Sequence, residues 1–77
     1  MFSASELEKI NIRECLKTVY QALQEKGYRP LDQLVGYLVS GDPSYITSHK
    51  DARFLIGQLE RIDILEEIVS DYFKGLE

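Results

Sequence analysis

Apolar residues recur at helical spacing along four stretches of the chain, and each stretch predicts a short helix. The stretches cover residues 12–26, 31–40, 49–60 and 64–74, and residues 42–46 add a single helical turn. No stretch shows the alternation of apolar and polar residues that is typical of a β-strand. The pattern therefore predicts an all-α fold, a compact bundle of four to five short helices.

The stretch 31–40 is the most apolar of the four and has the clearest ends. Gly27 can close the preceding helix in a left-handed conformation, and Pro30 suits a first helical position. Gly41 stops the helix. Because so apolar a short helix is usually central, we expect it to form a buried core around which the others wrap. Gly36 lies inside it, which suggests close approach of another helix.

Polar residues mark the expected helix starts. Asp42 followed by Pro43 begins the single turn, as an N-cap and a first helical residue do. Three further starts pair a cap with an acid three residues later, as in a capping box: Asn11 with Glu14, Ser48 with Asp51, and Asp63 with Glu66. Neither glycine nor proline separates the last two helices, so Arg61 and Ile62 either break them apart or join them.

The chain divides into two unequal parts. We expect residues 1–10 to form a partly ordered N-terminal tail and residues 11–77 to form a single helical domain. A chain this short buries only about 60% of the surface that it exposes when unfolded, and oligomers often compensate for this. The wide apolar faces of the helices therefore predict a homodimer. Its seam is expected at four residues: Gly36, Tyr37, Tyr72 and Phe73.

Composition and charge exclude several classes of function. The net charge of −4 argues against a general nucleic-acid binder, which needs a basic surface. Charged residues make up 29% of the chain, and no apolar run reaches the length of a membrane span or a signal peptide. We therefore expect a cytoplasmic protein that makes no contact with a membrane.

Residues that build catalytic and metal sites are scarce. Cys15 is the only cysteine and His49 the only histidine, which excludes an internal disulfide and a zinc site built from these residues. No serine has the surroundings of a hydrolase nucleophile, and no base is evident beside Cys15. We expect Cys15 to be a small core residue, and we expect no enzymatic activity, no metal and no cofactor.

One candidate site is a basic stripe, defined here as His49, Arg53 and Arg61. His49, Arg53 and Gly57 recur at the i, i+4 spacing and would line one face of the third helix, with Arg61 near its end. In an acidic chain this stripe would suit an acidic surface of a partner protein. The alternative is that Arg53 pairs with nearby acids and that His49 is an exposed residue of the first turn.

A long motif spans the helix 31–40 and its flanks. Its residues are Gly27, Tyr28, Pro30, Gln33, Gly36, Tyr37, Ser40, Gly41, Asp42, Pro43 and Tyr45. This motif resembles the signature of the IreB family, small regulatory phosphoproteins of Gram-positive bacteria. The resemblance continues through residues 49–53 and covers residues 12–73 in all.

The resemblance implies a compact all-helical homodimer without catalytic activity, in which the motif residues are mainly structural. It also implies that the protein is a target of a membrane-anchored Ser/Thr protein kinase that senses cell-wall fragments. Family members adjust peptidoglycan synthesis, in part by controlling the proteolysis of an early enzyme of the precursor pathway. The expected partners are therefore the kinase and a protein of cell-wall synthesis or of proteolysis control.

The sequence departs from the family pattern at its start. The family is phosphorylated on a threonine just ahead of a Met-Phe-like pair. Met1-Phe2 match the pair, but no threonine precedes them in this sequence, and Thr18 and Thr47 do not match. Either the sequence starts late or this member is regulated differently, with Ser3 and Ser5 as candidate substitutes.

Two other hypotheses remain. Short helices joined by glycine turns resemble a helix-turn-helix DNA-binding domain, although the acidic charge and the lack of Arg and Lys in residues 31–40 oppose it. An enzyme that uses Cys15 as its nucleophile is the other alternative.

Overall fold

The computed structural model describes the backbone of residues 4–76 and the side chains of residues 11–76. Its elements are α1 (Ala4–Glu25), α2 (Pro30–Ser40), the 3-10 turns η1 (Pro43–Tyr45) and η2 (His49–Asp51), α3 (Ala52–Gly57) and α4 (Arg61–Lys74). The described residues contain no strand, so the prediction of an all-α fold is confirmed. Residues 1–3 of the expected tail lie outside the described residues.

The first helix begins earlier than its cap pattern predicted. α1 starts at Ala4, so Asn11 lies inside the helix and the expected N-cap there is wrong. A helix of 22 residues is about 33 Å long, which makes α1 the longest element of the described chain. The local signal at Asn11 was therefore overridden by a helix that continues through it.

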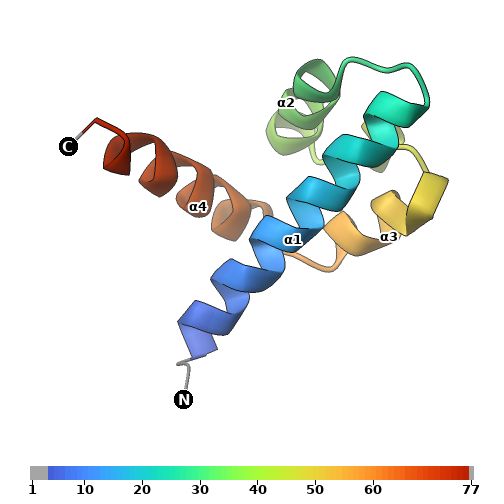
Figure 1. Ribbon diagram of the computed structural model, residues 1–77. Helices are drawn as coiled ribbons and strands as arrows, with labels where there is room; N and C mark the ends of the chain where they lie inside the picture. Colours follow the sequence, from blue (N-terminus) through green and yellow to red (C-terminus); the bar gives the residue numbers. More distant parts are fainter. Residues whose placement is uncertain (1–3, 77) are drawn as a thin grey trace.

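α1 is the helix on which the other elements pack. It contacts α2, α3, η2 and α4, which approach it from different sides (Figure 1). Val19, Ala22 and Leu23 of α1 are fully buried against side chains from the other elements. The buried partners from outside α1 are Tyr37, Ile46, Ala52, Ile56 and Ile64.

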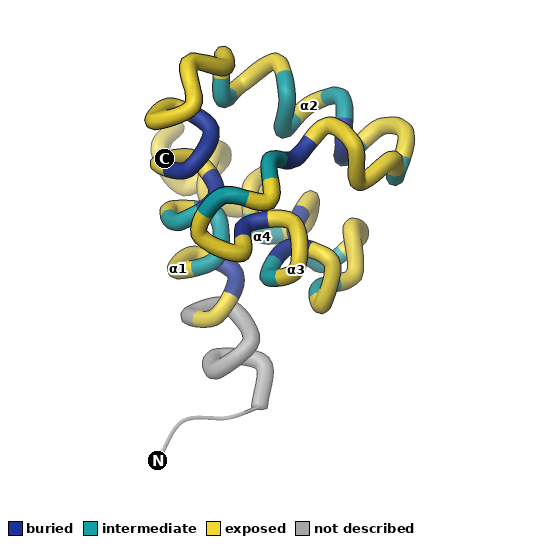
Figure 2. Tube along the Cα trace, turned by 90° about the vertical axis from the view of Figure 1, so that its right-hand side faces the viewer, coloured by how far each residue is buried: buried dark blue, intermediate teal, exposed yellow. Residues whose placement is uncertain are grey.

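The expectation that α2 forms the central core is wrong. Of its residues only Tyr37 is buried, while Leu31, Val35 and Val39 are 69%, 59% and 80% exposed. Figure 2 shows α2 on the outside of the structure, mostly half-buried or exposed. The high apolar content of α2 misled the prediction, because half of its apolar surface faces outward.

The predicted ends of α2 and the turn after it are confirmed. Gly27 and Gly41 have left-handed φ angles of 82° and 75°, and Pro30 is the first residue of α2. The Gly41 N–H donates to the Tyr37 carbonyl at 2.7 Å, which satisfies one of the last carbonyls of the helix. Asp42 caps η1 by accepting a hydrogen bond from the Ser44 N–H at 2.9 Å.

The predicted helix over residues 49–60 is wrong. The structure replaces it by η2 and the short helix α3, and the extended residue Glu60 separates α3 from α4. Neither Ser48 nor Asp51 makes a side-chain cap hydrogen bond, and Asp63 lies inside α4 rather than at its start. The open question about Arg61 is thereby answered, because Arg61 begins the last helix.

α4 is the least embedded helix. In Figure 1 it runs away from the crossing of α1 and α3, and only Ile64 is buried among its side chains. Seven further large apolar residues of α4 and the residues after it are exposed: Ile62, Leu65, Ile68, Val69, Tyr72, Phe73 and Leu76. In the single chain, the wide apolar face of this helix is therefore largely exposed.

Candidate functional site

The motif residues meet where η1 packs on α2. The Gln33 side chain donates through Nε2 to the Tyr45 carbonyl at 2.9 Å, which ties the turn to the helix. The Tyr45 ring lies directly over Gly36, where a Cβ atom would overlap the ring. The close approach predicted at Gly36 is therefore real, but it is made by this ring and not by another helix.

Ser40, Gly41 and Asp42 form a chain of hydrogen bonds at the end of α2. The Ser40 hydroxyl donates to the Gly36 carbonyl at 2.7 Å and accepts from the Asp42 N–H at 3.0 Å. The bond from the Ser44 N–H holds the pKa of Asp42 below its usual value. These residues satisfy the backbone of a tight connection, which is a structural use of the motif.

The two arginines of the basic stripe also bond to the main chain. Arg53 donates through Nε to the carbonyls of Pro43 and Ile46, at 3.1 and 2.9 Å. Arg61 donates through Nη1 to the Leu38 carbonyl at 3.1 Å, and its guanidinium packs against Gly41. Each arginine thus joins two elements, while the other N–H groups of its exposed side chain remain available for contacts.

The third member of the stripe faces the end of α1. His49 Nε2 lies 3.6 Å from Glu25 Oε1, and Lys50 Nζ lies 2.6 Å from Glu25 Oε2. The hydrogen bond from Lys50, helped by His49, lowers the pKa of Glu25 below its ordinary value. A carboxylate at the C-terminal end of a helix gains from such cations, since the helix dipole there is negative.

The three stripe residues do not share one helix face. His49 belongs to η2, Arg53 to α3 and Arg61 to α4, so the continuous face expected from their spacing is wrong. The interruption lies at Lys50 and Asp51, which have left-handed φ angles of 55° and 58°. This conformation costs L-residues about 1–2 kcal/mol each, although Asp tolerates it better than most.

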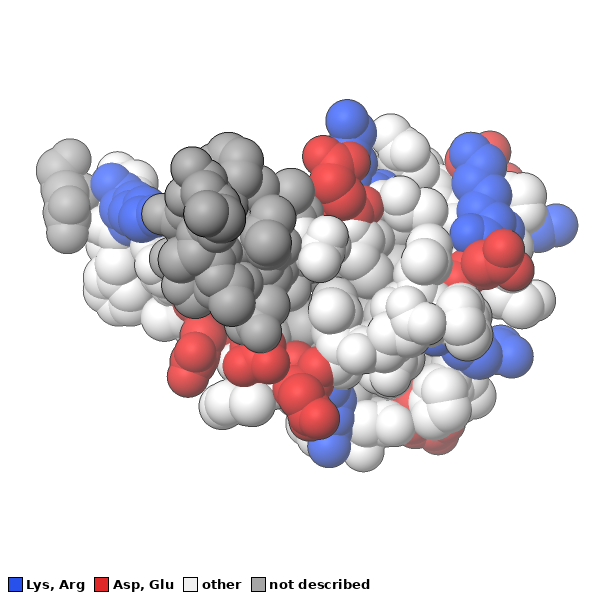
Figure 3. Space-filling model, turned by 90° about the horizontal axis from the view of Figure 1, so that it is seen from below, with Lys and Arg blue, Asp and Glu red and all other residues white. Residues whose placement is uncertain are grey.

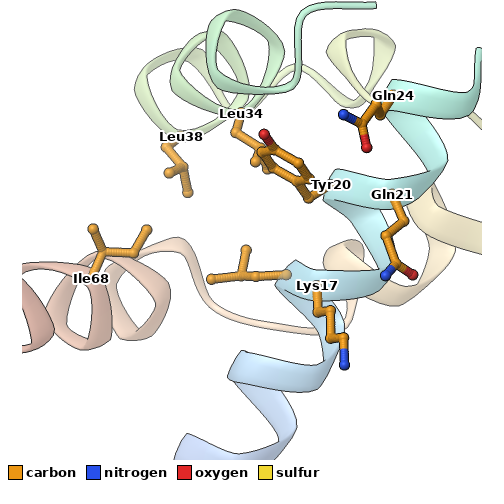
Figure 4. Close-up of a pocket in the computed structure, with 8 residues that line it drawn as sticks. Lys17, Tyr20, Gln21, Gln24, Leu34, Leu38 and Ile68 are labelled. Carbon is orange, nitrogen blue, oxygen red and sulfur yellow. The ribbon is translucent and has the colours of Figure 1, made fainter. Parts of the chain in front are cut away.

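The structure contains a groove that the sequence patterns did not reveal. It lies between α1, α2 and α4 and has a volume of about 460 Å³. Apolar side chains from all three helices point into it, and polar ones stand at its edge (Figure 4). The lining residues are Leu16, Lys17, Tyr20, Gln21, Gln24, Leu34, Leu38 and Ile68. Helical periodicity predicts that these apolar side chains lie on apolar helix faces, but it does not show which faces meet.

An ionic clasp crosses from α1 to the outer half of α4. Arg13 binds Glu67 through Nε at 3.2 Å and Asp71 through Nη2 at 2.8 Å. Glu67 and Asp71 are one helical turn apart, so a single guanidinium reaches both. Together with buried Ile64, this clasp links α4 to the rest of the chain.

Three observations concern catalysis, metal binding and insertion into a membrane. Cys15 is half-buried, and burial raises the pKa of its thiol, which disfavours the thiolate that a nucleophile needs. Among the described residues, no group of three or more His, Cys, Asp or Glu side chains is placed to hold a metal ion. In that same part of the chain, none of the helices combines the length and apolar character needed to cross a bilayer.

The comparison with protein families agrees with the motif. A family model described as IreB regulatory phosphoprotein matches residues 1–74. The match includes all four α-helices, the hydrogen-bonded connection between α2 and η1, and every residue of the basic stripe. The chain belongs to the IreB family of regulatory phosphoproteins.

Proposed function

We propose that the protein is a non-enzymatic regulator of the IreB type, which acts through protein contacts in the cytoplasm. In this proposal a Ser/Thr kinase pathway controls it, and it tunes peptidoglycan precursor synthesis in part through regulated proteolysis. The observation that carries the proposal is the family match over residues 1–74. The structural use of the motif residues also supports it, because their polar groups are occupied in holding the fold.

We propose further that the protein works as a homodimer. The support is the amount of apolar surface that a single chain leaves exposed on the outer face of α2 and on α4. The earlier seam is revised, since Tyr37 is buried in the core and the Tyr45 ring covers Gly36. The revised seam consists of exposed residues: Leu31, Val35, Val39, Val69, Tyr72 and Phe73.

We retain the basic stripe as the contact for an acidic partner surface. Arg53 and Arg61 each use one nitrogen for main-chain carbonyls, and their exposed guanidinium groups have further donors. His49 is next to Lys50, whose positive charge lies beside it at the end of α1, where both contact Glu25. Charge complementarity of this kind favours association and selects partners.

The DNA-binding alternative has less support. A recognition helix presents hydrogen-bond donors and acceptors to base edges, whereas the outward residues of α2 are Leu31, Val35 and Val39. On the face shown in Figure 3, Lys and Arg alternate with Asp and Glu around an uncharged centre. A duplex retarded by the protein in a gel shift at low salt would support this alternative, and free duplex would remove it.

The proposed function can be tested in the source cell. The gene is deleted, and the half-life of the early peptidoglycan-precursor enzyme is measured with and without an added wild-type copy. A changed half-life that the wild-type copy restores is expected. Full-length protein recovered from cells with and without the kinase is analysed for phosphate by mass spectrometry. An unchanged half-life together with unphosphorylated protein in both strains would contradict the proposal.

A further inference from the structure

One turn of the backbone, residues 48–51, adopts a conformation that its sequence disfavours. Lys50 and Asp51 are left-handed although neither is glycine. Ser48 and Asp51 have the spacing of a capping box, which would add a right-handed turn to the start of α3. In this structure neither side chain makes such a bond, and Asp51 is instead the left-handed residue that precedes α3.

The turn has its own hydrogen bonds, from the His49 N–H to Thr47 Oγ1 at 3.2 Å and from the Asp51 N–H to the Ser48 carbonyl at 3.1 Å, and it is also reached by the last residue of α1. Glu25 accepts Lys50 Nζ on one carboxylate oxygen, at 2.6 Å, and faces His49 Nε2 with the other, at 3.6 Å. Both side chains belong to η2, so the two contacts link this turn to the end of α1. Ile46 and Ala52, which flank the segment, are fully buried and confine any rearrangement to the residues between them.

We propose that residues 48–51 form a turn with two conformations, and that contacts with Glu25 stabilise the one seen here. With these contacts made, Lys50 and Asp51 keep the left-handed conformation seen here. With them broken, Lys50 and Asp51 relax to the right-handed conformation, and Ser48 and Asp51 cap a longer α3. The opened turn releases His49 and Lys50 from α1, so an acidic group of a partner competes with Glu25 for the same cations. This last step rests on the proposed function, whereas the two-state turn does not.

The test follows the backbone conformation of Lys50 in the full chain by NMR, because Cα chemical shifts distinguish left-handed from right-handed residues. Glu25→Gln removes the charge and keeps the shape of the side chain. The ratio of right-handed to left-handed Lys50 is expected to rise about two- to fivefold, which corresponds to the loss of an exposed ion pair. Raising the salt to about 1 M in the wild type should shift it in the same direction.

Two further variants complete the test. Asp51→Gly in the Glu25→Gln background favours the left-handed turn and should return the Lys50 shift toward its wild-type value. Asp32→Asn removes another exposed carboxylate, which pairs with Arg29 at 3.9 Å, and should leave the Lys50 shift unchanged. An unchanged Lys50 shift in both Glu25→Gln and high salt, or the absence of a return with Asp51→Gly, would overturn the proposal. Salt acts on the wild-type chain, so the test also stands if a variant unfolds.

Discussion

The absence of a side chain at Gly36 allows the turn after α2 to pack closely on the helix. Because Gly36 has no Cβ, the Tyr45 ring can approach the helix closely there, and the Gln33 amide reaches the Tyr45 carbonyl. The helix loses about 1 kcal/mol of intrinsic propensity by carrying glycine instead of alanine. The contact with Tyr45 and the hydrogen bond that it permits offset this cost.

We predict that Gly36→Ala lowers the free energy of unfolding by about 1–3 kcal/mol, because the added Cβ displaces the Tyr45 ring. Chemical denaturation measures the effect. Gly57→Ala is the matched control, since a Cβ at this helical glycine meets no atom within 4 Å. It should raise stability by up to about 1 kcal/mol. A Gly36→Ala variant that is also more stable would show that the ring moves without cost.

Replacing the arginines of the basic stripe is expected to lower stability more than their exposure alone suggests. Removal of an exposed charge usually changes stability by no more than about 0.5 kcal/mol. Since Arg53 and Arg61 bond to main-chain carbonyls, we instead predict that Arg53→Ala with Arg61→Ala costs about 1–3 kcal/mol in total. Thermal melting gives the stability, and capture of the partner below the melting temperature gives the binding.

Lysine substitutions separate the two roles of these arginines. Arg53→Lys with Arg61→Lys keeps both charges but loses the guanidinium geometry. If the arginines are mainly structural, the lysine pair melts early and still captures the partner. Normal partner capture by the folded alanine pair would place the partner contact elsewhere on the surface.

The lowered pKa of Glu25 predicts how its ion pairs respond to acid. Lys50 and His49 lower this pKa in the folded chain, so the unfolded chain binds a proton more readily. The stabilisation is therefore present above the unfolded pKa, about 4.5, and is lost as the pH falls through the lower folded value. We expect the difference in melting temperature between wild type and Glu25→Gln to vanish in acid. A difference that persists at low pH would contradict the assignment.

At the scale of elements, α4 is attached at few points and is the helix most easily released. Ile64 is buried between it and the core, Arg13 clasps its outer half, and Arg61 bonds its first residue to α2. Ile68 adds an apolar side chain to the groove that it shares with Leu16 and Leu38, but it is 41% exposed. The helix is therefore held by one buried side chain, a half-exposed apolar contact and two arginines.

We predict that Ile64→Ala costs about 2–4 kcal/mol, because it leaves a cavity at the only buried position of α4. The control is Ile62→Ala in the same helix, where the side chain is 61% exposed and the expected change is below about 0.5 kcal/mol. Denaturant unfolding of both variants measures the difference. Equal losses would show that Ile62 is covered in solution, for example by a second copy.

At the scale of the whole molecule, the single chain leaves many large apolar side chains exposed to water. Single apolar residues on a surface are normal, but α4 and the outer face of α2 each present several along one helix. Homodimer interfaces resemble a domain core divided between two chains. Dimerisation would remove this surface from water without any change in the core around α1.

We predict that light scattering at micromolar concentration gives twice the chain mass of 8.9 kDa. Val69→Lys with Phe73→Lys should halve the measured mass and leave the helical circular dichroism intact, because both residues are exposed in the single chain. Ser70→Lys, an exposed neighbour in the same helix, is the control for added charge. A wild-type mass of 8.9 kDa would refute the dimer. A double-lysine variant that remains dimeric would show that the interface lies away from α4.

The sequence by itself determined the features that depend on neighbouring residues. Gly27 closes α1, Pro30 and Gly41 set the two ends of α2, and Asp42 sets the start of η1, because their backbone preferences and caps act within a few positions. Helical periodicity predicted the all-α fold for the same reason. The motif led to the family directly, because it is a property of the sequence.

Only the tertiary structure decided the features that depend on residues far apart in the chain. The Glu25 contact with Lys50 accompanies a left-handed turn where the local pattern predicted a helix, and the Arg61 contact with Leu38 turns a surface charge into a link between helices. The position of α1 at the centre also depended on these distant contacts, since apolar content favoured α2. Periodicity shows which face of a helix is apolar, but only the folded chain shows what covers it.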